Sequence, residues 1–138
     1  MAFLDELRRS RARPVPHLRV LRTTLRTLHL LAAAALYGGH VHGVEAARLV
    51  PALGATLVTG GAFLALEVWR FPPWLVQLRG AATFAKLALL ACVPLFWEWR
   101  VVILSAVLAI GVVTAHMPGR YRYRSLLSGV PAGPEDKG

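Results

Sequence analysis

Six ionisable side chains interrupt the long apolar runs of this sequence, and they are the residues whose types could do chemistry. They are His29, His40, His42, Glu67, Lys86 and His116. Imidazoles bind transition metals and haem iron, and a carboxylate beside an amine can relay protons. Because a charge is costly inside an apolar segment, we treat each of these side chains as a functional candidate.

The composition around them predicts an integral membrane protein. Of 138 residues, 56% are hydrophobic and 17% are charged, with a mean hydropathy of +0.52. Soluble domains carry about 25% charged residues and have too little interior to hide so much apolar sequence. In a membrane protein, a net charge of +9 indicates basic residues that gather on the cytoplasmic side. Because this explains the charge, we expect no nucleic-acid partner. Cys92, the only cysteine, excludes a disulfide framework.

Four apolar runs are long enough to cross a bilayer, because about 20 helical residues span its hydrocarbon core. They cover residues 24–44, 49–69, 78–96 and 99–117. Short connections make sequential helices antiparallel neighbours. The expected fold is therefore an all-α, up-down-up-down bundle of four transmembrane helices over residues 23–118. Residues 1–22 are expected to be a basic segment with an interfacial helix, and 119–138 a basic, then disordered, tail.

Basic residues concentrate before the first run, between the second and third, and after the fourth. This distribution predicts a multi-pass protein of a bacterial inner membrane with both termini in the cytoplasm. The four tryptophans fall at the expected membrane edges, as in an aromatic belt. They are Trp69, Trp74, Trp97 and Trp99. Tyr121 and Tyr123, which alternate with arginines, resemble an anchor to anionic headgroups.

Threading the four helices through a bilayer places His29, Glu67, Lys86 and His116 within roughly 10 Å of the cytoplasmic boundary, at 1.5 Å per residue. Each helix thus supplies one polar group to the same layer. A haem b needs one or two imidazoles from facing helices and small residues beside the porphyrin. The layer therefore predicts haem b with His29 and His116 as the axial pair. Gly60, on the stripe of Glu67, would leave room for it.

Other roles follow from the same residues. Haem propionates would need cations at the membrane edge, such as Arg26, Arg79, Arg120 or Arg122. Glu67 and Lys86 would form a buried ion pair or relay protons beside a quinone or porphyrin substrate. His40 would hold a second haem or a quinone in the outer leaflet. In simpler interpretations His29 hydrogen-bonds between helices, His116 lies among headgroups and Glu67 pairs with Arg70.

The stretch GGHVHG at residues 38–43 is a second candidate site. On a continuous helix His40 and His42 point in nearly opposite directions, so they cannot chelate one metal. The flanking glycines could unwind the helix into an extended segment, which places both imidazoles on one side. Such a segment would bind copper or zinc, with Glu45 nearby.

Two short segments resemble a known group of proteins. Residues 28–31 (LHLL) followed by 37–39 (YGG) resemble the first helix, LH…W-G-G, of small bacterial haem-linked membrane proteins. These include the HemJ-type protoporphyrinogen oxidases and the CopD-type copper-resistance membrane domains. Residues 85–90 (AKLALL) are similar to the Lys-Leu start of the third helix in the same groups. The resemblance implies His29 as the haem-ligand position and Lys86 as the third-helix lysine.

Together these observations predict a haem b-binding inner-membrane protein in electron transfer or membrane redox chemistry, with a quinone or porphyrin partner. Two alternatives stay open. One is a non-catalytic small subunit of a larger membrane complex or homo-oligomer, and the other is a small proton-coupled transporter. The sequence contains no nucleophile motif, phosphate loop or HExxH zinc motif that would define an enzyme class.

Overall fold

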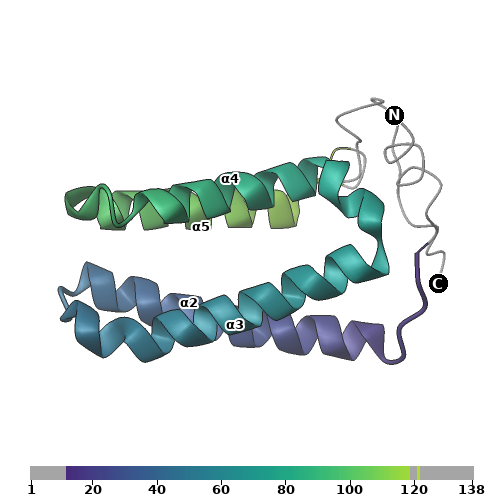
Figure 1. Ribbon diagram of the computed structural model, residues 1–138, viewed down its shortest axis with the longest axis horizontal. Coiled ribbons are helices and arrows are strands. Elements are labelled where there is room, and N and C mark those ends of the chain that lie inside the picture. The colour runs from purple at the N-terminus through teal and green to yellow at the C-terminus, as the bar shows by residue number, and fades with distance from the viewer. Residues whose placement is uncertain (1–11, 119–120, 122–138) are drawn as a thin grey trace. The chain divides into compact units, whose positions relative to one another are not determined.

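The computed structural model describes residues 12–118 and 121, and every element within them is helical (Figure 1). The order is α2 (Leu18–Val41), α3 (Ala46–Arg70), η1 (Pro72–Val76), α4 (Leu78–Cys92), η2 (Trp97–Trp99) and α5 (Arg100–His116). This confirms the all-α prediction and is compatible with a helical bundle. The described residues divide into two compact units, residues 14–67 and residues 12–13 with 68–118 and 121.

The first unit is a helical hairpin whose turn is closed by a glycine. Gly43 adopts the left-handed conformation, with φ at 69°. The Val44 N–H donates to the Gly39 carbonyl at 2.9 Å, and the Gly43 N–H donates to the His40 carbonyl at 3.3 Å. These two bonds form a Schellman motif, which satisfies the last carbonyls of α2. The turn lets α3 run antiparallel to α2 (Figure 1).

Glycines also set how closely α2 and α3 meet. A Cβ atom at Gly39 would collide with the Leu49 side chain, and one at Gly60 would lie 2.8 Å from Cε1 of His29. Arg22 and Glu67 meet near the other end of the hairpin. From Gly39 with Leu49 to Arg22 with Glu67, the residue numbers fall along α2 and rise along α3. The pairs therefore define one antiparallel register.

The second unit begins at a buried corner. Phe71 precedes two prolines, and a residue before proline is disfavoured in the helical conformation, so α3 ends at Arg70. The Arg70 carbonyl accepts a hydrogen bond from the Arg13 N–H at 2.8 Å. Phe71, Trp74 and Gln77 are buried at this corner. The sequence suggests that residues 71–77 are only a connection between helices, but in the structure they form a packed corner.

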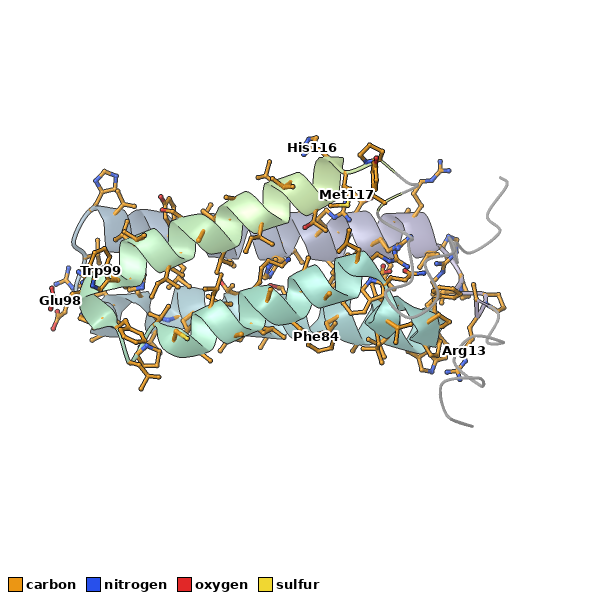
Figure 2. The ribbon with its side chains drawn as sticks, turned by 90° about the horizontal axis from the view of Figure 1, so that it is seen from above. Arg13, Phe84, Glu98, Trp99, His116 and Met117 are labelled. Atoms are coloured by element: carbon orange, nitrogen blue, oxygen red, sulfur yellow. The ribbon has the colours of Figure 1, made fainter. Side chains whose placement is uncertain are left out.

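Beyond the corner, α4 and α5 form a second hairpin and lie close to each other (Figure 1). Pro94 follows the end of α4, and the N–H groups of Leu95 and Phe96 both donate to the Cys92 carbonyl. The chain then reverses through η2 into α5. Figure 2 shows Glu98 and Trp99 together at this reversal.

Two of the four predicted spans are long and apolar enough to cross a membrane, judged by length and composition in the described residues. These are Ala46–Arg70, with 25 residues, and Trp97–His116, with 20. The other two differ from the prediction. α4 ends at Cys92 after 15 residues, which is about 22 Å of helix. α2 begins at Leu18 rather than residue 24 and includes Arg19, Arg22 and Arg26.

The four tryptophans of the predicted aromatic belt differ in exposure. Trp69, Trp97 and Trp99 are exposed, but Trp74 is only 5% exposed because it packs into the corner of the second unit. Several predictions fall outside the described residues. They concern the interfacial helix before residue 12, the cations Arg120 and Arg122, Tyr123 and the tail after it. Tyr121 is described and is exposed.

Candidate functional site

One face of α2 meets α3 through polar side chains. Arg22, Arg26 and His29 recur at the spacing that places residues on the same helical face. Their partners on α3 are Glu67, Phe63, and Gly60 with Thr56. We call these seven residues the α2–α3 seam. It lies entirely within the first unit.

Arg22 and Glu67 form a bidentate ion pair at one end of the seam. Nε of Arg22 donates to Oε1 of Glu67 at 2.5 Å, and Nη2 donates to Oε2 at 2.7 Å. The Glu67 side chain is 3% exposed and that of Arg22 is 33% exposed. The planar guanidinium matches a carboxylate in this geometry. Arg22 is therefore the ion-pair partner of Glu67, a role for which the sequence predicted Lys86.

The sequence offered one signal for this pair. Arg22 and Glu67 lie almost equally far from the turn between α2 and α3, so an antiparallel hairpin brings them level. Arg22 was not predicted as the partner of Glu67 because it lies among the basic residues that flank the first apolar run.

Arg26, the predicted propionate partner, packs one turn further along α2. Its guanidinium carbon lies 5.6 Å from the centroid of the Phe63 ring, which is a cation–π contact. The Arg26 side chain is otherwise exposed. The contact holds the charge near the same end of the hairpin as the ion pair.

His29 lies between the two helices, and its contacts define which ring nitrogen carries the proton. Nδ1 is 3.1 Å from the Thr56 carbonyl oxygen and 3.4 Å from Oγ1 of Thr59. The Thr59 hydroxyl donates to the Ala55 carbonyl at 2.6 Å. Because a carbonyl can only accept, Nδ1 is the donor, and Nε2 of the neutral ring keeps its lone pair. Histidines that bind metals or haem iron share this arrangement.

Gly60 makes room for the His29 ring itself. A Cβ atom at Gly60 would lie 2.8 Å from Cε1 and 3.0 Å from Nδ1 of His29. The sequence analysis assigned this glycine to the approach of a flat cofactor, whereas its close neighbour is the imidazole. Gly61, the next residue, has no atom within 4 Å of its Cβ position. Of these two glycines, only Gly60 therefore allows α3 to approach the His29 ring closely.

His116 and Lys86 lie in the second unit. His116 is the last residue of α5, and its Nδ1 is 2.9 Å from the Val112 carbonyl oxygen one turn earlier. The same reasoning makes Nδ1 the donor and leaves Nε2 with a lone pair. The side chain is exposed at the end of α5 (Figure 2). Lys86 is half-buried in the middle of α4 and makes no hydrogen bond or ion pair to the residues described.

The predicted metal site at His40 and His42 lacks the geometry it requires. α2 stays helical through Val41, and His42 is its C-cap, so the expected extended segment is wrong. Gly43 instead closes the turn. Glu45 lies 4.0 Å from Arg48, with both side chains exposed. Within residues 12–118 and 121, no three His, Cys, Asp or Glu side chains gather to hold a metal ion.

Fold and site together define an all-α protein in which an imidazole and a bidentate ion pair are held between two antiparallel helices. No protein-family model, curated protein or solved structure matches the chain.

Proposed function

We propose that this chain is a multi-pass protein of a bacterial inner membrane that binds haem b through His29 and takes part in electron transfer. The observation that carries the haem assignment is the donation from Nδ1 of His29 to the Thr56 carbonyl. This bond orients the ring and leaves Nε2 as the ligand atom.

The exposed surface of the long helices supports a membrane location. On α3, Val58 is 72% exposed, and on α5, Val113 is 64% exposed. Only 6% of the most apolar stretch in each of these helices is buried. Burial of apolar surface contributes about 25 cal/mol per Å², so water is a poor environment for these faces. Lipid tails would cover them without that cost.

The distribution of charge supports an orientation. The turn of the first unit carries Glu45 and Arg48, and the reversal of the second carries Glu98 and Arg100. Each of these tips is therefore balanced. At its opposite end the first unit carries three arginines against Glu67, and the described residues at the corresponding end of the second unit include the basic residues Arg13, Arg70 and Arg79. Cytoplasmic ends are rich in basic residues, so the tips would face outward and both open ends would face the cytoplasm.

The donor set of the chain fits a haem b. His29 and His116 each have Nδ1 bonded to a backbone carbonyl, so each would offer Nε2 to a haem iron. Arg26 would bind a propionate at the membrane edge. When bound, haem b supplies one-electron redox chemistry, and a quinone or porphyrin is the partner that the proposal implies. The protein would orient the imidazoles, and His29 is half-buried between α2 and α3.

Optical spectra of the purified full chain test this proposal. We expect a Soret band that shifts on reduction, with the α band of haem b after conversion to the pyridine haemochrome. His29→Ala and His116→Ala should each lower the haem content at least tenfold. His42→Ala, which alters an exposed imidazole at the turn, is the matched control and should leave it unchanged. A full haem content in both His29→Ala and His116→Ala would refute the assignment.

The ion pair favours a second candidate, a non-catalytic subunit of a larger membrane complex. A buried polar pair can specify how two helices align, and Arg22 engages both oxygens of Glu67. In this role the seam would serve only to fix helix register. A purified chain without haem that co-purifies with other membrane subunits would support this candidate.

The same pair argues against the transporter alternative. A proton-coupled transporter needs a carboxylate that exchanges protons with both sides of the membrane. Glu67 is 2% exposed, and Arg22 binds both of its oxygens. Proton flux that Glu67→Gln abolishes and His116→Ala leaves unchanged would restore that alternative.

A further inference from the structure

The hydroxyl groups of this chain fall into two sets. Five of the eight described Ser and Thr side chains donate to the carbonyl four residues earlier in their own helix, at 2.6–3.1 Å. These five are Thr56, Thr59, Thr83, Ser105 and Thr114. The other three, Thr23, Thr24 and Thr27, all lie in the first ten residues of α2, and none of them bonds to a described residue.

This difference marks a change of environment along α2. Inside hydrocarbon a hydroxyl has no water to bond, so an unsatisfied one costs free energy. Back-bonding to the helix removes that cost, and the threonines and serine of α3, α4 and α5 all use it. The threonines of α2 are exposed and therefore suit a medium that supplies its own hydrogen-bond partners.

The same turns of α2 carry exposed cations. Arg19, Thr23, Arg26 and Thr27 are all exposed, and their spacing of four, seven and eight residues places them on one face. Arg22, on the turn between the two arginines, is neutralised by Glu67. Large apolar side chains are also exposed alongside, at Val20, Leu21 and Leu28. The face combines the exposed guanidinium of Arg19, the exposed guanidinium of Arg26 beside the Phe63 ring, two hydroxyls and an apolar border.

We propose that this face, formed by Arg19, Thr23, Arg26 and Thr27, binds the headgroup phosphates of anionic phospholipids in the cytoplasmic leaflet. Guanidinium groups and hydroxyls are donors to phosphate oxygens, and the apolar neighbours would contact the acyl chains. The first ten residues of α2 then lie among headgroups, and the hydrocarbon begins near Leu28. The inference rests on the proposed membrane insertion. It shares Arg26 with the proposed haem site, where that side chain would bind a propionate, whereas Arg19 is assigned to phosphate alone.

Lipid retention by the purified full chain tests it. The protein is equilibrated in mixed micelles with equal amounts of phosphatidylglycerol and phosphatidylcholine, re-isolated, and its bound lipids are counted by mass spectrometry. We expect phosphatidylglycerol to be enriched about 25-fold, since each of the two arginines near an anionic surface contributes about a fivefold preference. Arg19→Gln should lower the enrichment about fivefold, and Arg19→Gln with Arg26→Gln should bring the ratio close to one.

Two further variants separate this face from surface charge in general. Arg48→Gln removes an exposed arginine at the turn of the same unit and should leave the enrichment unchanged. Thr23→Val with Thr27→Val keeps every charge and should lower it about twofold, because a hydrogen bond contributes modestly. Equal enrichment in the wild type and the double arginine variant would overturn the proposal, as would an equal loss in Arg48→Gln. An unchanged ratio in the threonine variant would remove the hydroxyls from the site.

Washing membranes with alkaline carbonate separates this inference from the proposed function. A chain that stays with the membrane but shows no lipid preference contradicts only the headgroup site. A chain that the wash removes contradicts membrane insertion itself, and the headgroup site with it.

Discussion

The two units of this chain hold their helices together by different means. In the first, α2 meets α3 through Arg22 with Glu67, Arg26 with Phe63, and His29 with Thr56. In the second, α4 contributes five alanines and approaches α5 closely, while Thr83 and Ser105 bond within their own helices. Among the described residues, the ionisable side chains with named contacts across a pair of helices are thus those of the first unit.

If the chain is inserted in a membrane, as proposed, the contrast follows from the forces that act between helices in lipid. Between helices surrounded by lipid there is little hydrophobic driving force, so close packing of small residues and interhelical polar contacts hold them together. The second unit relies on close approach, and the first adds polar contacts to the close approach at Gly39 and Gly60. A substitution that disturbs close packing at one site, or a single polar contact, should therefore destabilise only the unit that contains it.

The largest effect is expected at Gly80, where the second unit depends on close backbone approach. A Cβ atom there would collide with the Trp74 carbonyl oxygen and lie 2.9 Å from that of Leu75. These are backbone atoms that a rotamer change cannot move. Gly80→Ala should therefore destabilise the protein by about 3 kcal/mol, the upper range for overpacking. The midpoint of thermal unfolding in detergent measures it.

Gly111→Ala in α5 is the matched control for that substitution. Its Cβ position has no atom within 4 Å, and alanine has the higher helix propensity, by up to about 1 kcal/mol. We expect unchanged or raised stability. If both variants lose stability equally, close approach at Gly80 is not what holds the corner.

The next effect is expected at the ion pair of the first unit. Glu67→Leu leaves the Arg22 guanidinium without its bidentate partner. Breaking a fully buried pair costs about 3–5 kcal/mol. Because the Arg22 side chain is one-third exposed, we expect about 2 kcal/mol, with hydration recovering part of the loss.

The double variant Arg22→Leu with Glu67→Leu shows whether that loss comes from the stranded charge. Replacing both partners by apolar residues is often close to neutral, so the double variant should recover most of the stability. An equal loss in the single and double variants would mean that the pair contributes through shape rather than charge. Chemical denaturation of all three proteins under one condition measures the coupling.

The sequence predicts the helices of this fold better than their contacts. Apolar runs and short connections indicate four helices, and all four form. Their ends were also readable. Pro94 limits α4, and Gly43 follows the last turn of α2 as a terminating glycine does. Gly43 was instead interpreted as part of an unwound metal site, because His40 and His42 suggested metal binding and the capping role of the glycine was not considered.

The candidate site was harder to predict, because contacts between helices depend on register. His29 and Glu67 stand out from composition alone. That Arg22 pairs with Glu67 follows only once the turn at Gly43 sets which residues lie level. The role of Gly60 depends on the same register, since nothing local says that an imidazole faces it. Only the polar groups, and not their partners, can be identified from the types of residues.

The smallest effect is expected at Gly60, and it tests the His29 contact most directly. A Cβ atom there would lie 2.8 Å from Cε1 of His29. The ring would have to turn, which breaks its bond to the Thr56 carbonyl. A hydrogen bond contributes about 1 kcal/mol, and alanine restores up to about 1 kcal/mol through helix propensity. Gly60→Ala should therefore change stability little while it lowers haem content several-fold.

Gly61→Ala provides the comparison one residue away, on the same helix and with the same change of side chain. No atom lies within 4 Å of its Cβ position, so it should gain up to about 1 kcal/mol of stability and keep its haem. A loss of haem confined to Gly60→Ala would tie ligand binding to the orientation of His29. Equal haem content in the two variants would mean that the imidazole binds iron, if at all, without the hydrogen bond to Thr56. The contrast between the units would then concern packing alone.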